Sequence, residues 1–343
     1  MNSFERTVAF IKGGKFDRPP VHPIIMRFAA KYANVPYSRF CQDYTAKCSA
    51  AIKCADDFDL DWVTVMSDPY AEASAFGLKV EYPYDDLPKH SEYVLRTQND
   101  FDNLKCPKIS EHARMATRVK EVETFHKQVK DTKFIVGWVE GMLAEYTDLR
   151  GMSDAFFDLY DDCARVKRAC DIFFELAASF ATAQIKAGAH CIGIGDAACS
   201  QIGPEQYHEI FFPYEKKLVE HIHSCGAMAK IHICGNISGI LNGLIKTGAD
   251  IIDIDYMVTA VPQEVKNLLP NQVFSGCADP VSVLQNGKPE TIREKVREEY
   301  KNAGGRMIVS AGCEVTPETS LENFKAFCEC AKTFKVPSSK YEN

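Results

Sequence analysis

The sequence lacks the features that would place the protein in a membrane, outside the cell or on a nucleic acid. No run approaches the roughly 18 consecutive apolar residues of a membrane span. The opening stretch MNSFERTVAFIKGGKF has early charges and no apolar core of about 7–15 residues, so it is not a signal peptide. The formal charge is −7 and no basic stripe occurs, which argues against a phosphate-backbone partner. We expect a cytoplasmic protein with neither a nucleic-acid nor a membrane partner.

The sequence also contains no linker rich in Gly, Ser or Pro, no low-complexity tract and no repeat beyond an alternation of strands and helices. Its 343 residues exceed an average domain, but α/β barrels often run longer as one unit. Apolar residues make up 46% of the chain, enough for a large core. We therefore expect a single domain over 1–343. Fourteen cysteines in an intracellular chain suggest reduced thiols or metal ligands rather than disulfides.

Short apolar runs rich in β-branched residues recur, and each is followed by a longer helical pattern. Eight such strands alternating with helices predict an α/β fold, a closed (β/α)8 TIM barrel. The pattern loosens over 69–130, where LKVEYPYD and SEYVLRTQ suggest an inserted hairpin and helix excursion after the second strand. The strands are predicted at 21–26, 62–68, 134–141, 190–197, 227–235, 250–257, 272–279 and 306–313.

Active sites of such barrels lie at the C-terminal ends of the strands. In this sequence those ends are dense in acids and in residues that bind metals. They carry Asp68, Glu140, Asp196, His232, Cys234, Asp255, Cys277, Asp279 and Cys313. This clustering predicts that the chemistry of the protein takes place there.

The stretch KIHICGN places His232 and Cys234 two apart at the end of a predicted strand. Residues i and i+2 point to the same face of a strand, so their side chains have the spacing to share one metal ion. A lone His-x-Cys pair is more often a core histidine and a core cysteine. The position at a strand end, and the later acid Asp255 and Cys313, favour the metal site. Cys277 is the rival third cysteine.

The whole chain resembles the uroporphyrinogen decarboxylase superfamily, from ERTVAFIKGGKFDRPPV to SAGCEVTPETSLENFKAF. Its metal motif is most similar to that of the zinc-dependent methylcobamide:coenzyme M methyltransferases. The resemblance implies Zn²⁺ at His232, Cys234 and Cys313, and a corrinoid protein as the partner that carries the methyl group. It also implies a small acceptor, either a thiol such as coenzyme M or tetrahydrofolate.

The resemblance also suggests roles for other residues around the predicted metal. Asp255 matches the acid that completes a similar zinc site in cobalamin-independent methionine synthase, and it is predicted as the fourth ligand or the holder of a water there. Asp196 is predicted to support the site. Both acids are thus candidates for catalytic residues. The predicted substrate-binding residues are Arg27, Asp68, Trp138, Glu140 and Cys277.

Two alternatives remain open at this stage. The first is a tetrapyrrole decarboxylase of the same superfamily, whose motif after the first strand carries two arginines. In IIMRFAAKY, Arg27 is retained but Lys31 stands at the second arginine, and lysine does not reproduce the bidentate fork. The second is a non-catalytic member of the fold that binds a tetrapyrrole or a partner protein. Bound zinc that is lost on His232→Ala would favour the methyltransferase.

Overall fold

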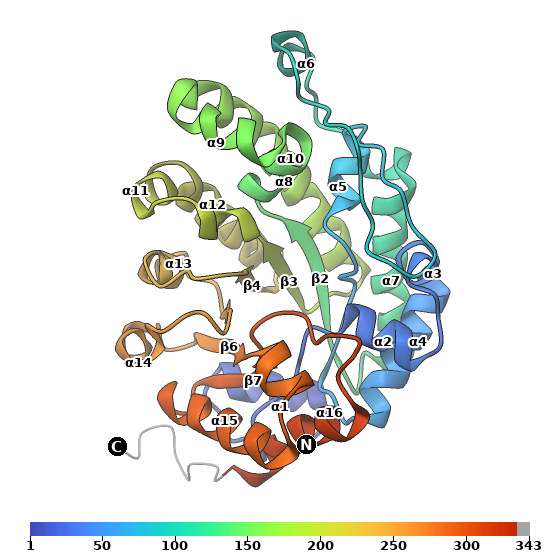
Figure 1. Cartoon of the computed structure of the whole chain (residues 1–343), viewed down its shortest axis with the longest axis vertical. Coiled ribbons are helices and arrows are strands. Elements are labelled where there is room, and N and C mark those ends of the chain that lie inside the picture. Colours follow the sequence, from blue (N-terminus) through green and yellow to red (C-terminus); the bar gives the residue numbers. More distant parts are fainter. Residues whose placement is uncertain (335–343) are drawn as a thin grey trace.

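The computed structural model describes residues 1–334, apart from the side chain of Cys277. Its centre is a curled parallel sheet in which every strand pairs with the next strand along the chain (Figure 1). The predicted α/β alternation with parallel strands is therefore confirmed. The seven strands are β1 (Trp62–Thr64), β2 (Phe134–Glu140), β3 (Cys191–Gly195), β4 (Met228–Ile233), β5 (Ile251–Ile254), β6 (Val273–Ala278) and β7 (Met307–Ala311).

The strand predicted over 21–26 forms only isolated bridges. Val21 makes a parallel bridge to Val309 in β7, and its carbonyl oxygen accepts a hydrogen bond from the N–H of Asp61. The segment thus lies between β7 and β1, where an eighth strand of a barrel would run. Prolines in RPPVHP lack the N–H groups that a regular ladder needs, which explains why no full strand forms. The fold is TIM-barrel-like, with seven regular strands in the described part of the chain.

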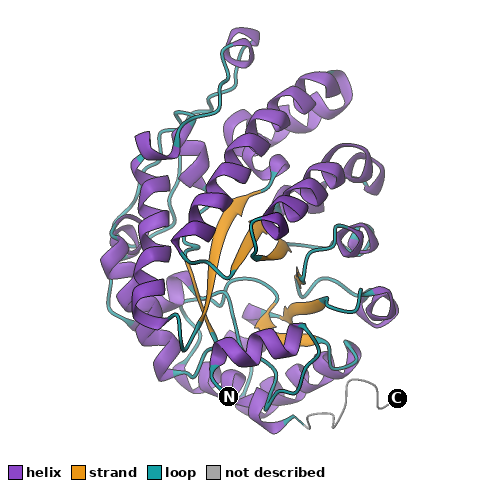
Figure 2. Cartoon of the chain, turned by 180° about the vertical axis from the view of Figure 1, so that it is seen from behind, coloured by secondary structure: helices purple, strands orange, loops and turns teal. Residues whose placement is uncertain are grey.

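Helices surround the strands on the outside (Figure 2). None of the helices in residues 1–334 is long and apolar enough to cross a membrane. The α-helices are α1 (Ser3–Ile11), α2 (Met26–Tyr32), α3 (Tyr37–Gln42), α4 (Tyr44–Asp57), α5 (Tyr70–Ala75), α6 (Gln98–Asp102), α7 (Ala113–Val129), α8 (Met142–Arg150), α9 (Met152–Asp161), α10 (Cys163–Ala187), α11 (Pro204–Gln206), α12 (Phe212–Ser224), α13 (Leu241–Lys246), α14 (Val261–Glu264), α15 (Pro289–Asn302) and α16 (Leu321–Cys330).

The region predicted as an excursion, 69–130, contains α5, α6 and α7. Helix α7 is the connection that crosses from β1 to β2, so only the stretch between α5 and α7 departs from the alternation. The predicted hairpin is reduced to a single antiparallel bridge, Glu81 with Lys89. Pro83 and Pro88 interrupt this segment and remove donors from it. Figure 1 shows α6 at one end of the molecule, beyond α8 and α9.

A separate apolar cluster fills the inside of the sheet at its N-terminal end. Phe10 and Ile11 of α1 pack there against residues from the beginnings of several strands, among them Trp62, Phe134 and Cys191. Helix α1 therefore covers the N-terminal ends of the strands. The C-terminal ends, where the predicted metal ligands lie, are left for polar side chains.

Candidate metal centre

The centre begins at the end of β4. His232 is the second-last residue of β4, with Gly195 of β3 and Asp253 of β5 as its register partners. Its ring is almost fully buried, and Nε2 lies 3.1 Å from Sγ of Cys234. Gly235 then has φ +92°, a left-handed conformation that lets the chain turn directly after Cys234. The end of β4 therefore places the side chains of His232 and Cys234 next to each other, and the chain turns away directly afterwards.

The third donor comes from the loop after β7. Sγ of Cys313 lies 3.4 Å from Sγ of Cys234, and the donor atoms of His232, Cys234 and Cys313 all lie within 4.8 Å of one another. Donors bound tetrahedrally to one zinc ion would be about 3.5–3.8 Å apart, given bonds of ~2.0–2.3 Å. A Cβ on Gly312 would lie 2.2 Å from the backbone nitrogen of Tyr256, so the missing side chain permits this close approach. The three donors fit zinc.

Two charged residues that the sequence analysis did not single out support His232 from inside the barrel. Nδ1 of His232 lies 3.1 Å from Oδ2 of Asp253, and Nζ of Lys230 lies 2.7 Å from the same oxygen. Lys230 also lies over the rings of Trp62 and Trp138. A carboxylate at Nδ1 fixes the orientation of a histidine and leaves Nε2 for the metal. The sequence offers one signal for Lys230: residues 230 and 232 are two apart in a strand, so their side chains point to the same face.

The electrostatics of the site favour a thiolate. The hydrogen bond with Cys234 lowers the pKa of the Cys313 thiol to about 5, although burial acts in the opposite direction. The same interaction raises the pKa of Cys234, so the two sulfurs share a proton unequally. Because metals bind the thiolate form of cysteine, a lowered pKa of Cys313 favours the form that a zinc ligand requires.

Both acids predicted as catalytic are held by backbone N–H groups. Asp255 accepts from Gly235 at 2.8 Å and from Met257 at 3.1 Å, so it fixes the turn after Cys234. It is not in the converging set of three donors. Asp196 accepts from the N–H groups of Leu143 and Ala144 in the first turn of α8. The carboxylate of Asp196 belongs to a separate buried group, with Cys199 and Glu215.

Two of the predicted substrate-binding residues lie beside the centre. The Trp138 ring is 6.4 Å from the His232 ring, measured between centroids. The indole N–H of Trp138 donates to Oε1 of Glu140 at 2.8 Å. The end of β2 therefore contributes an aromatic ring and a buried carboxylate to the surroundings of His232.

The other predicted substrate-binding residues are engaged elsewhere. Asp68 is buried and pairs with Arg114 at 2.5 Å. The backbone N–H of Arg27 donates to Glu314, the neighbour of Cys313, while its guanidinium lies 3.9 Å from Asp86. Cys277 is also predicted to bind substrate, but its side chain lies outside the described part of the structure.

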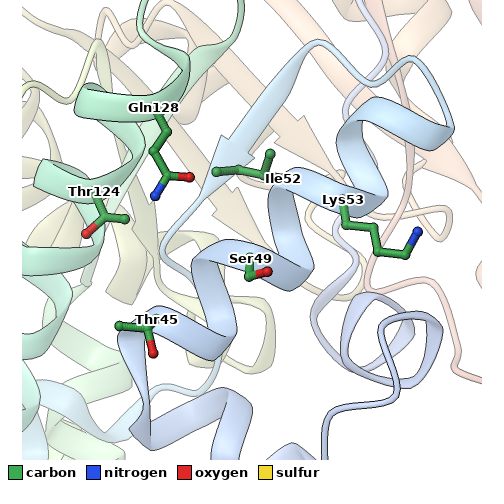
Figure 3. A pocket seen from close by; sticks show the side chains of 6 residues that line it. All are labelled: Thr45, Ser49, Ile52, Lys53, Thr124 and Gln128. Atoms are coloured by element: carbon green, nitrogen blue, oxygen red, sulfur yellow. The ribbon is translucent and has the colours of Figure 1, made fainter.

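A surface hollow lies between the outer helices α4 and α7 (Figure 3). None of the predicted site residues lines it. It is lined by Thr45, Ser49, Ile52, Lys53, Thr124 and Gln128.

Comparisons with known proteins agree with the fold and leave the reaction open. The profile of the uroporphyrinogen decarboxylase (URO-D) family matches residues 2–334. Methylcobamide:CoM methyltransferase MtbA of Methanosarcina acetivorans is 27% identical over 277 residues, which cover 80% of either protein. Uroporphyrinogen decarboxylase of Solibacter usitatus is 27% identical over 285 residues, covering 81% of this chain and 80% of that protein.

A solved structure of a methyltransferase from Methanosarcina mazei has the same fold. It superposes with a TM-score of 0.88 and covers 96% of this chain and 98% of its own, at 18% sequence identity. Since decarboxylase and methyltransferase relatives are equally identical to this chain, overall similarity does not choose between the reactions. The residues of the site have to do so.

Proposed function

Because the chain belongs to the uroporphyrinogen decarboxylase (URO-D) family, we propose that, among the reactions of its relatives, it catalyses a zinc-dependent methyl transfer. The methyl group would move between a corrinoid carried by a partner protein and a small acceptor, most simply a thiol. The observation that supports this choice is the convergence of His232, Cys234 and Cys313 within 4.8 Å. Coenzyme M is the acceptor in the name of one relative.

Each residue has a part in this proposal. His232, Cys234 and Cys313 would hold the metal with three donors, which would leave one position for the acceptor, as in catalytic zinc sites. Zinc bound there would supply Lewis acidity that keeps a bound thiol as thiolate near neutral pH. Asp253 holds His232 in one orientation, and Asp255 holds the turn that follows Cys234.

The transfer balances without an external oxidant. The acceptor thiol gives its proton to solvent, and its sulfur uses an electron pair to form the new bond to carbon. The cobalt–carbon bond breaks and its electron pair stays on cobalt, so cobalt(III) becomes cobalt(I). The Trp138 ring lies beside His232, and the burial of the strand ends limits competition from water.

The decarboxylase alternative finds less support in the site. Lys31, at the place of the family's second arginine, pairs with Glu318 on the surface at 2.8 Å, and both side chains are more than half exposed. Decarboxylation would also leave three converging metal donors without a task. The non-catalytic alternative likewise gives no reason for a preformed donor set at the strand ends.

The test is an assay of the purified protein with methylcobalamin and a panel of acceptors, including thiols and tetrahydrofolate. Loss of the cobalt–carbon absorbance with stoichiometric zinc supports the proposal. Decarboxylation of uroporphyrinogen by zinc-free protein would instead establish the alternative. Retention of zinc with no transfer to any acceptor would favour the non-catalytic role.

A further inference from the structure

Four carboxylates gather beside the metal centre at the end of β2. Glu140 is the last residue of β2, Glu72 comes from α5, and Glu145 and Asp148 come from α8. The backbone N–H of Glu140 donates to Oε1 of Glu72 at 3.0 Å. Glu72 and Glu145 are each 2% exposed, and Glu140 is 7% exposed. We call these four residues the carboxylate cluster.

Several oxygens of the carboxylate cluster have no hydrogen-bond partner in the described part of the chain. These are Oε2 of Glu72, both side-chain oxygens of Glu145 and Oδ2 of Asp148. Burial, together with the neighbouring carboxylates, raises the pKa of Glu145 well above its usual range and that of Asp148 to about 8. Buried acceptors without donors are uncommon and costly, so the fold alone does not account for them.

The nearby arginines do not fill this need. Arg114 pairs with Asp68 at 2.5 Å, and Arg118 donates to the backbone carbonyl of the same residue. The charge of Arg118 reaches Glu72 and Glu140, where it lowers their pKa against the larger effect of burial. In the described residues, no cation offsets Glu145, which faces only Glu72, Asp148 and Glu140.

The carboxylate cluster also lies at the right place relative to the metal donors. Glu140 and His232 are both in register with Gly195, on the strand between them. Aligned residues of a parallel sheet share a face, and two strand spacings amount to about 10 Å. A Cβ on Gly195 would lie 2.6 Å from Cζ2 of Trp138 and 3.1 Å from Oε2 of Glu140, so the missing side chain makes room for the indole ring and the carboxylate beside each other.

Resting on the proposed function, we propose that the carboxylate cluster binds a cationic amine at the far end of the methyl acceptor. An ammonium group carries up to three N–H donors, which match the unpartnered oxygens of Glu72 and Glu145. Its charge also offsets the repulsion that keeps these carboxyl groups protonated. The preferred acceptor is then an aminothiol rather than a thiol with a negative group.

A metal ion is a poorer occupant of the carboxylate cluster. Among the described residues, the groups with three ligand atoms mutually within 4.8 Å do not include Glu72, Glu140, Glu145 or Asp148. Their oxygens are thus more widely spaced than bonds of ~2.0–2.2 Å to one ion allow. Hydrogen bonds of ~2.7–2.9 Å let an ammonium group bridge two of these carboxylates without needing a third.

Three thiols with the same two-carbon chain test the proposal: cysteamine (cationic), 2-mercaptoethanol (neutral) and 2-mercaptoethanesulfonate (anionic). With zinc-loaded protein and methylcobalamin, kcat/KM is expected to be highest for cysteamine. Glu145→Gln should lower the ratio of cysteamine to 2-mercaptoethanol by at least about tenfold, as expected when a charged hydrogen-bonding partner is lost. Glu299→Gln, at a partly buried glutamate on α15, is the control and should leave the ratio unchanged.

A second measurement keeps the amine site separate from methyl transfer. Calorimetry with 2-(methylthio)ethylamine, the methylated product, should show binding to the wild type and at least about tenfold weaker binding to Glu145→Gln. Asp148→Asn, which is less buried, serves the same purpose if Glu145→Gln does not fold. Faster transfer to the sulfonate overturns the amine site but leaves the methyltransferase intact. If no thiol is methylated, the proposed function fails, and an absence of product binding then also overturns the amine site.

Discussion

The carboxylate of Asp253 lies 3.1 Å from Nδ1 of His232 and 2.7 Å from Nζ of Lys230, and all three side chains are buried. One oxygen thus orients a metal donor and is itself held by a lysine. Asp253→Asn removes the charge that favours this orientation of the imidazole. We expect zinc affinity to fall about 10–100-fold, as for other partners of metal-bound histidine. Competition with a chromophoric chelator measures it.

Asp250→Asn is the control for that experiment. Asp250 precedes β5 and lies 2.8 Å from Nε2 of His223, a histidine that is outside the metal centre. This variant should bind zinc as the wild type does. Equal zinc affinity for Asp253→Asn and Asp250→Asn would show that Asp253 does not support the metal.

Lys230→Met should destabilise the protein. It leaves Asp253 buried without its lysine partner, and breaking one partner of a buried ion pair costs about 3–5 kcal/mol. The free energy of unfolding in urea, measured with zinc present, checks this value. Lys230→Met combined with Asp253→Asn should recover part of the loss, because the uncompensated charge is then gone. A double variant less stable than the sum of the single changes would contradict this explanation.

Cys234→Ser and Cys313→Ser should each abolish most methyl transfer while circular dichroism stays like that of the wild type. A hydroxyl does not replace a thiolate as a zinc ligand, so the loss should exceed the roughly 10–100-fold that follows from disturbing a ligand's partner. Cys328→Ser is the control, since Cys328 is buried in α16, away from the strand ends. Similar activity of Cys313→Ser and Cys328→Ser at saturating zinc would mean that Cys313 is not a ligand.

Asp255→Asn should weaken the turn after Cys234 without removing zinc. The aspartate accepts two backbone hydrogen bonds, from Gly235 and Met257, and an amide offers one oxygen instead of two. Leaving one donor unsatisfied costs about 1–3 kcal/mol. Thermal unfolding and zinc analysis of the same sample test this prediction. If the variant loses its zinc, Asp255 is a zinc ligand after all.

The alternation of strands and helices was readable from the sequence because each strand of a parallel sheet is a short apolar run. Seven of the predicted strands exist in the structure, and 21–26 is wrong as a strand because prolines interrupt its ladder. The meeting of His232, Cys234 and Cys313 followed from the same pattern, since the C-terminal ends of all parallel strands lie at one end of a curled sheet, where β4 and β7 face each other.

Other parts of the site could not be predicted in this way. Lys230 and Asp253 resemble ordinary strand residues until the register places them on one face. The carboxylate cluster combines residues of β2, α5 and α8. Nothing in the sequence indicates that the face of α5 with Glu72 lies against the face of α8 with Glu145. Asp255 and Asp196 had the expected positions at strand ends, but their oxygens are taken up by backbone N–H groups that the sequence does not reveal.

The most direct test of the central claim is zinc-edge X-ray absorption of the purified protein, with and without a thiol acceptor. The proposed centre predicts two sulfur neighbours and one imidazole nitrogen from the protein at about 2.3 Å and 2.0–2.1 Å. Addition of the thiol should bring a third sulfur neighbour, since the acceptor takes the open position. A sulfur count that does not change on addition of any thiol that the protein methylates would show that the acceptor is not activated at His232, Cys234 and Cys313.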